Sequence, residues 1–222
     1  MRSIILTLAI ILTCSFLYAQ YENVDQDEFV SETQHLDTDN SNMKMVWWIP
    51  IEFWKVIMSQ EESLSDAQVV ELVDALSPYV IFGVIHGEMS NYGAIRYTPQ
   101  DEIKSSIRFV DANGMTQLPI PEENLNTETQ ILLNVFEPLL KNMIGEMGEN
   151  FRFYVFKDIN GRGVRVADPL AEGTLTLTMM GEDYKWETPL SSLLPPRKCP
   201  VDNAPMNGSW NYCPIHGDKL SK

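Results

Sequence analysis

The chain has 222 residues, of which 31 are acidic and 16 are Lys or Arg, so that its formal net charge is −15 at pH 7. Nucleic acids and anionic membrane surfaces are also negatively charged, so the net charge of the protein repels both and excludes electrostatic binding to them. The length is enough for one large domain or two small ones.

The first 19 residues have the pattern of a cleavable secretory signal peptide. Arg2 precedes an apolar run over residues 4–18, and the small residue Ala19 follows this run. A helix that spans a bilayer needs roughly 20 apolar residues, and the segment after this shorter run is acidic. We therefore expect cleavage after Ala19 and no stable membrane insertion afterwards. Loss of Arg2 leaves 15 basic against 31 acidic residues, a net charge of −16.

Lipid attachment at Cys14 is the alternative for this segment. Such a site needs a small residue before the cysteine, whereas Thr13 is larger, and the apolar run continues past Cys14 to Leu17. The signal-peptide interpretation is therefore favoured, and it predicts an exported protein that is periplasmic or secreted.

We expect residues 20–42 to form an acidic, disordered tether. The segment contains no Lys or Arg, and its few apolar residues offer little burial to offset the entropy of ordering. The folded domain is expected to begin at Met43 and to extend to residue 196. The acidic residues of the tether are Glu22, Asp25, Asp27, Glu28, Glu32, Asp37 and Asp39.

The helices of this domain are predicted from capping residues and apolar periodicity. Pro50 suits the first turn of a helix, and Ser65 with Gln68 forms a capping box before another. A longer apolar stripe after Thr127 predicts the clearest helix, which Pro138 should kink or split. The predicted helices cover 50–59, 65–77, a short segment opening at residue 98, and 127 to about 147.

The strands are predicted from β-branched apolar runs between turn residues. Asn113 and Gly114 supply the positive φ that a tight hairpin needs. Helices, then strands with short connections, predict an α+β fold with a largely antiparallel sheet, one long helix and two or three short ones. The predicted strands cover 79–85, 94–97, 107–110, 115–118, 151–156, 164–166, 174–180 and 184–187.

The C-terminal segment 197–222 contains two similar cysteine turns. They read Cys199-Pro-Val-Asp202 and Cys213-Pro-Ile-His216-Gly, and Trp210 precedes the second. This segment resembles a zinc ribbon, in which each knuckle reads Cys-Pro-x-Cys and Gly follows the second. Here Asp202 and His216 stand in place of two cysteines, and both residue types are accepted zinc ligands. The resemblance implies a ribbon-like module with one structural zinc at Cys199, Asp202, Cys213 and His216.

A disulfide between Cys199 and Cys213 is the competing interpretation of this module. The ribbon geometry that the resemblance implies brings the two cysteines together, and an oxidising compartment favours their oxidation over zinc binding. Closing this loop contributes roughly 3 kcal/mol in the chain-entropy model. We therefore favour the disulfide, and zinc binding and free thiols are the alternatives. The module stabilises the chain in either of the first two, because a site with four protein ligands has no open position for catalysis.

The body of the chain also resembles exported bacterial proteins of no assigned function. The resemblance extends from Trp47-Trp48-Ile-Pro through Leu193-Leu-Pro-Pro to the Cys-Pro tail. It implies a bacterial envelope setting and no particular chemistry.

His86 is the candidate catalytic residue, because His35 lies in the tether and His216 in the tail. It stands where a predicted strand ends, and Glu88 could orient its imidazole. No Gly-x-Ser-x-Gly or His-Glu-x-x-His motif and no nearby cysteine completes a catalytic set. We therefore expect a non-catalytic protein, and a hydrolase of unfamiliar type that uses His86 and Glu88 is the alternative.

An aromatic cluster lies at the start of the domain, where Phe53 accompanies three tryptophans. We favour a role in the core, and the alternative is a platform of Trp47, Trp48 and Trp54 that binds a peptide or glycan. Trp47 and Trp48 would point to opposite faces of a strand, so we expect one to remain exposed.

Taken together, these patterns predict an exported, non-catalytic binding or accessory protein of the bacterial envelope. Its expected partner is an envelope protein, a peptide or a glycan, and not a nucleic acid. The expected cofactor is either none or one structural zinc.

Overall fold

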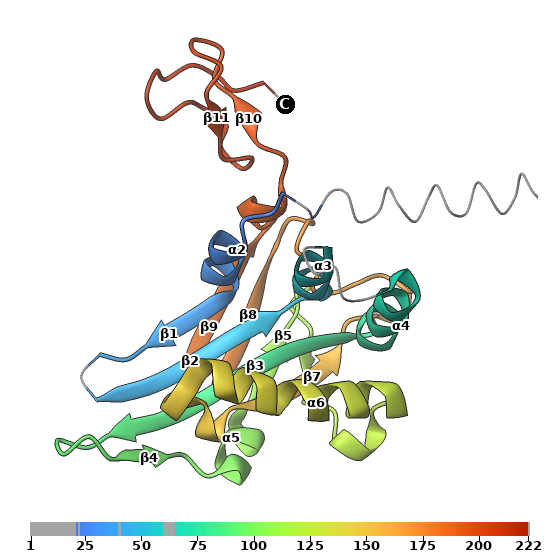
Figure 1. The fold of residues 1–222 in the computed structure, drawn as a ribbon, viewed down its shortest axis with the longest axis vertical. Coiled ribbons are helices and arrows are strands. Elements are labelled where there is room, and N and C mark those ends of the chain that lie inside the picture. Colours follow the sequence, from blue (N-terminus) through green and yellow to red (C-terminus); the bar gives the residue numbers. More distant parts are fainter. Residues whose placement is uncertain (1–20, 22, 40, 60–64, 222) are drawn as a thin grey trace, which may run out of the picture.

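The computed structural model describes residues 21, 23–39, 41–59 and 65–221 (Figure 1). The expected signal peptide and Cys14 lie outside these residues. The described part is an α+β fold with antiparallel sheets, which confirms the predicted fold class. The α-helices are α2 (Gln26–Thr33), α3 (Ile51–Ser59), α4 (Asp66–Leu76), α5 (Gln100–Ser106) and α6 (Thr127–Ile144).

Two sheets make up most of the body. The five-stranded sheet runs β1-β2-β3-β4 with β7 also on β3, and the four-stranded sheet runs β6-β5-β8-β9. A separate hairpin, β10 (Arg197–Lys198) with β11 (Pro205–Met206), belongs to the C-terminal module. The body strands are β1 (Gln34–Asp37), β2 (Asn42–Ile49), β3 (Tyr79–Met89), β4 (Ile95–Tyr97), β5 (Arg108–Val110), β6 (Thr116–Gln117), β7 (Arg152–Lys157), β8 (Gly173–Met179) and β9 (Glu182–Thr188).

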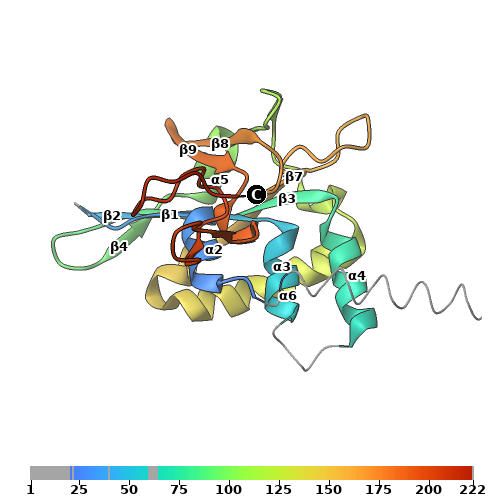
Figure 2. The same ribbon diagram turned by 90° about the horizontal axis from the view of Figure 1, so that it is seen from above.

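The body has three layers. Seen from above in Figure 2, β8, β9 and α5 lie on one side of β2 and β3, whereas α3, α4 and α6 lie on the other. Phe82 of β3 meets the second sheet, where its ring lies 5.3 Å from that of Trp186 and 5.5 Å from that of Phe109. On the opposite face of the sheet, Trp47 of β2 packs edge-on against Phe53 of α3 at 4.9 Å.

The segment expected to be a disordered tether is folded, so that prediction is wrong for residues 23–39. Asp25 caps α2 by accepting hydrogen bonds from the N–H groups of Asp27 and Glu28 at 3.0 and 3.1 Å. Phe29 is fully buried, and Thr33 accepts a hydrogen bond from the indole of Trp47 at 3.2 Å. The acidic composition of the segment therefore gave no indication of this helix, although its few apolar residues pack against the core.

Glu32 ties this helix to the far end of the chain. Its carboxylate accepts hydrogen bonds from the N–H groups of Ser191 and Ser192 at 2.9 and 3.0 Å, and from both of their hydroxyls. These groups open the 3₁₀ helix η3 (Ser191–Leu193), whose first N–H groups have no partner within the helix. The acidic residue therefore caps a distant element instead of facing solvent.

The predicted helices and strands are mostly confirmed, but strand β2 was not predicted, and the main differences among the predicted elements are the following. Strand β3 continues to Met89, four residues past its predicted end, because it pairs with β2 and β4 there. Helix α6 continues through Pro138, so that of the two predicted effects of this proline the split does not occur. The predicted strand over 164–166 is a loop with a single bridge between Arg165 and Ile159. None of the helices in the described residues is long and apolar enough to span a membrane.

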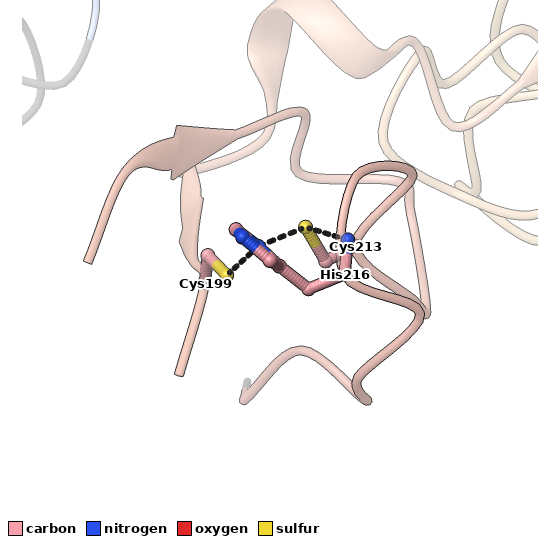
Figure 3. A group of neighbouring side chains, drawn as sticks. All are labelled: Cys199, Cys213 and His216. Atoms are coloured by element: carbon pink, nitrogen blue, oxygen red, sulfur yellow. Dashed lines mark hydrogen bonds between the residues drawn. The ribbon is translucent and has the colours of Figure 1, made fainter. Parts of the chain in front are cut away.

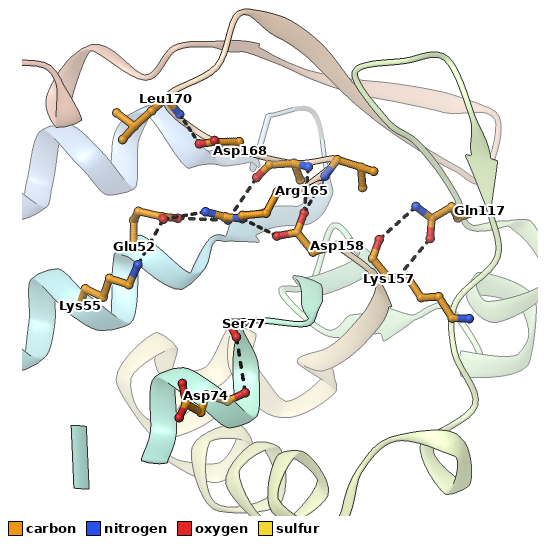
Figure 4. Close-up of polar contacts among 12 residues, drawn as sticks. Glu52, Lys55, Asp74, Ser77, Gln117, Lys157, Asp158, Arg165, Asp168 and Leu170 are labelled. Atoms are coloured by element: carbon orange, nitrogen blue, oxygen red, sulfur yellow. Dashed lines mark hydrogen bonds and ion pairs between the residues drawn. The ribbon is translucent and has the colours of Figure 1, made fainter. Parts of the chain in front are cut away.

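A buried ion network joins α3 to the loop after β7 (Figure 4). Arg165 donates to Glu52 at 2.8 and 3.3 Å and to Asp158 at 2.6 Å. Glu52 is 3 % exposed and Asp158 is 1 % exposed. Asp158 also accepts the N–H groups of Val166 and Ala167 at 3.1 and 2.9 Å. Two carboxylates can be buried here because the guanidinium pairs with both and the ammonium of Lys55 lies 3.6 Å from Glu52.

We expect Arg165→Met to lower the free energy of unfolding by about 3 kcal/mol, because it leaves the buried Asp158 without a cation and Glu52 with only Lys55, 3.6 Å away. Urea unfolding followed by tryptophan fluorescence measures the change. Arg96→Met is the matched control, since Arg96 pairs with Glu88 at 3.0 Å while both side chains are largely exposed. Equal unfolding midpoints for the two variants would show that the network contributes no more than a surface pair.

Candidate metal centre

The C-terminal module extends from the body after η3 as a separate lobe (Figure 1). It has its own small core, consisting of Cys199, Met206, Cys213 and Leu220. The hairpin β10-β11 carries the first cysteine turn, and an antiparallel bridge between Tyr212 and Lys219 encloses the second. Each cysteine thus lies in a turn that a short antiparallel pair closes.

The two knuckles have the same backbone hydrogen bonds. In the first, Cys199 donates its N–H to Ala204 O and accepts that of Asn203, at 2.9 Å each. In the second, Cys213 donates to Asp218 O and accepts from Gly217, at 2.8 Å each.

The fifth residue of each knuckle has a positive φ, +60° at Asn203 and +77° at Gly217. Asn and Gly are the residues that adopt this conformation most readily. Asp202 and His216 therefore occupy equivalent positions, each directly before the left-handed residue.

Three donor side chains converge between the knuckles (Figure 3). The ligand atoms of Cys199, Cys213 and His216 all lie within 4.8 Å of one another, and this group could hold a metal ion. His216 Nδ1 lies 3.3 Å from Cys199 Sγ and 3.6 Å from Cys213 Sγ. Both cysteines are buried and His216 is exposed, so the group lies at the surface of the module.

Backbone N–H groups point at both sulfurs. His216 donates its N–H to Cys213 Sγ at 3.4 Å. Burial acts to raise the pKa of Cys213, but hydrogen bonds from the N–H groups of His216 and Ile215 and from the His216 side chain outweigh it and lower the pKa. Burial raises the pKa of Cys199, although the N–H groups of Asp202 and Val201 oppose this. Cys213 is therefore the readier of the two to become the thiolate that a metal requires.

Asp202, the fourth predicted ligand, lies beside the group but not within it. Its Oδ1 accepts the N–H of Ala204 at 3.0 Å, and this hydrogen bond and one with the Cys199 thiol lower the pKa of Asp202. The carboxylate is thus ionised and adjacent to one of the sulfurs. The structure brings three of the four sequence-predicted ligands together and places the fourth next to them.

Cys199 and Cys213 are both free, so the expected disulfide does not join them in this structure. Their sulfurs nevertheless belong to the same 4.8 Å group.

His86 and Glu88 do not form the expected pair. His86 Nδ1 makes a 2.7 Å hydrogen bond with Thr98 Oγ1, while Glu88 pairs with Arg96 at 3.0 Å. Burial and then the charge of Lys44 lower the pKa of His86. The sequence did not indicate Lys44 as a neighbour, because only the pairing of β2 with β3 places it opposite His86.

The three tryptophans do not form an exposed platform. Trp47, Trp48 and Trp54 are 6 %, 0 % and 7 % exposed, which corrects both the platform hypothesis and the expectation that Trp47 or Trp48 remains exposed. Both faces of β2 are covered, one by helices and the other by the second sheet. Trp54 stacks on Phe136 at 4.3 Å, and its Nε1 is the one fully buried side-chain nitrogen or oxygen without a partner in the described part of the chain.

Sequence reasoning missed the equivalence of the fifth knuckle residues. The stretches Cys-Pro-Val-Asp-Asn and Cys-Pro-Ile-His-Gly align without a gap, and their last residues are those that favour positive φ.

Comparison of the chain with family models, with curated proteins and with solved structures finds no match.

Proposed function

We propose that residues 197–221 are a zinc-binding module in which Cys199, Asp202, Cys213 and His216 hold one structural ion. The observation that carries this proposal is the spacing of the donor atoms. Tetrahedral zinc with Zn–S of about 2.3 Å and Zn–N of about 2.0 Å separates sulfur and nitrogen ligands by roughly 3.5 Å. The separations of 3.3 and 3.6 Å from His216 Nδ1 to the two sulfurs match this value.

The equivalence of the knuckles supports Asp202 as the fourth ligand. A single ion between two turns of the same backbone receives a cysteine and a fourth-position residue from each. A small rotation of the Asp202 side chain away from its contact with Cys199 would complete a tetrahedral set of two sulfurs, one nitrogen and one oxygen. Four protein ligands leave no open position, which favours a structural role over a catalytic one.

The surroundings of the sulfurs favour the metal over the disulfide. Thiolates are strong acceptors of backbone N–H groups, whereas a disulfide sulfur carries no charge to be stabilised in this way. His216 contacts both sulfurs and has no function in a disulfide-linked module. Zinc binding gives a function to all four side chains.

The module contacts the body at the first turn of α2. Asn207 Nδ2 donates to Glu28 Oε1 at 3.4 Å, and Gly208 packs so tightly on Leu194 and Pro195 that an added Cβ would lie 2.5 Å from Leu194 Cβ. We infer that zinc orders a lobe attached to an otherwise complete domain. This role agrees with the expected exported, non-catalytic binding or accessory protein of the bacterial envelope, which remains a proposal.

Zinc-free, reduced protein should bind one equivalent of Co²⁺ and show the ligand-field bands of tetrahedral cobalt with thiolate charge transfer. Zinc should displace the cobalt, and removal of zinc should lower the melting temperature. Absorption titration and metal analysis of protein exported by its host provide the measurements. Exported protein that lacks metal, weighs two hydrogens less and resists alkylation until it is reduced would identify the disulfide instead.

The Asp202→Asn substitution should lower the zinc affinity at least tenfold, because a neutral amide is a much poorer zinc ligand than a carboxylate. The amide oxygen can still accept the Ala204 N–H, so the turn should persist. Competition with a chromogenic chelator measures the affinity. Asp218→Asn, in the second knuckle, is the control and should bind zinc like the wild type. Unchanged affinity in Asp202→Asn would mean that Asp202 is not a ligand.

A further inference from the structure

A groove runs along the outer edge of β7. Strand β7 pairs with β3 on one side only, and no other strand of the described residues pairs with its second edge. The groove is a cavity of about 380 Å³ bounded by α5, α6 and the segment 119–125. Its lining includes Asp101, Lys104, Asn134, Glu137, Arg152 and Tyr154.

One half of this edge is already paired by the chain itself. Ile120 donates its N–H to Val155 O at 2.7 Å, and the Gln117 side chain bonds the N–H and the C=O of Lys157 at 3.1 Å each. The segment 117–120 thus takes the place of a neighbouring strand. The end of this segment, Pro119 and Ile120, already lines the groove.

The other half of the edge has unpaired main-chain groups. Polar groups alternate along a strand, so Phe153 points its N–H and C=O the same way as Val155 and Lys157, away from β3. Asp158 belongs to the other, even-numbered set of residues, and its N–H donates a hydrogen bond to Pro78 O on the β3 side. Within the described residues, Phe153 N–H, Phe153 C=O and Val155 N–H have no hydrogen-bond partner. Phe153 and Val155 both line the groove.

Tyr154 adds an unpaired hydroxyl. The residue is 7 % exposed, and no described group forms a hydrogen bond with its Oη. Burial raises the pKa of Tyr154 to about 12, with Arg152 opposing and the carboxylates of Asp101 and Glu137 adding to the increase. The phenol therefore stays protonated at neutral pH and can donate as well as accept.

The charges at the groove favour a cationic ligand. Asp101 and Glu122 have no ion-pair partner in the part of the chain that the structure describes, whereas Glu137 is held by Lys141 at 2.8 Å and by Arg152 at 3.1 Å. Among the residues that the structure describes, Lys104 is the one cation of the lining without an ion-pair partner. Two free carboxylates against one free ammonium leave the groove net acidic.

We propose that this groove binds an extended peptide segment with a basic side chain, which adds a short strand to the open half of β7. The main-chain groups of this edge lack hydrogen-bond partners. A peptide strand supplies alternating N–H and C=O groups at the spacing that they require. The open stretch from Arg152 to Val155 is about 10 Å long at roughly 3.3 Å per residue, which suits two or three peptide residues. The basic side chain would lie between Asp101 and Glu122.

This inference is independent of the zinc proposal, because the groove lies in the body and shares no residue with the C-terminal module. The probe is the capped peptide acetyl-Thr-Val-Lys-Val-Thr-amide, titrated into the ¹⁵N-labelled chain with its metal content held constant. We expect saturable shifts of the Phe153 and Val155 amide signals, with a Kd on the order of 1 mM. The same peptide with N-methylated backbone amides should not bind, and one with Glu in place of Lys should bind at least fivefold more weakly.

Asn134→Trp, on the exposed wall of the groove, should weaken binding of the peptide at least tenfold by filling the cavity. The control is Asn142→Trp, an exposed position on the same helix that does not line the groove. Three results would overturn the proposal: no saturable shift at Phe153 and Val155, equal binding of the N-methylated peptide, or equal binding by both tryptophan variants. Equal binding of the Lys and Glu peptides would contradict the part of the proposal that assigns a basic side chain to the ligand.

Discussion

The arrangement of the body depends on the burial of β3 on both faces. Residues 80–87 of this strand are buried, and its two edges pair with β2 on one side and with β4 and β7 on the other. An apolar strand in this position needs a layer on each face, and the second sheet and the helices provide them. The strand has no side chain where the ring of Phe151 crosses it: an added Cβ at Gly83 would lie 2.5 Å from that ring.

The polar groups of this interior are satisfied by pairing across elements. Arg165 lies between the buried carboxylates of Glu52 and Asp158, which α3 and the end of β7 supply, and Lys55 pairs with the first of them. Thr33 accepts hydrogen bonds from two tryptophans. Its hydroxyl accepts from the indole N–H of Trp47, and its carbonyl accepts from that of Trp186. These bonds fix α2 against both sheets. The same requirement makes the open half of the β7 edge unusual, since its main-chain groups lack such partners within the described part of the chain.

The C-terminal module follows a different physical rule. Its core consists of four residues, which is too few to offset the entropy of ordering a lobe of this size through burial. Lobes of this kind depend on a cross-link or a bound ion, and the two cysteines with His216 lie where either could form. The body supplies the remaining support, through the tight packing of Gly208 on the segment before β10.

The local elements were largely predictable from the sequence, because caps, turns and periodicity act over a few residues. The capping box of Ser65 and Gln68 and the hairpin turn before Gly114 formed as expected. The failures involved contacts that are distant in sequence. The acidic segment 23–39 folds because Trp47, Trp186 and the η3 segment lie beside it, and no local pattern encodes that proximity.

The candidate metal site shows the same division. The sequence by itself determined the knuckles, since Cys-Pro-x-x followed by Asn or Gly encodes each turn locally, and it identified Cys199, Cys213 and His216 as candidate ligands. Only the tertiary structure decided that Cys199, Cys213 and His216 converge, that Glu88 does not reach His86, and that the tryptophans of β2 are buried. The physical reason is that backbone turns depend on neighbours in the chain, whereas burial and convergence depend on which strands pair and which layers cover them.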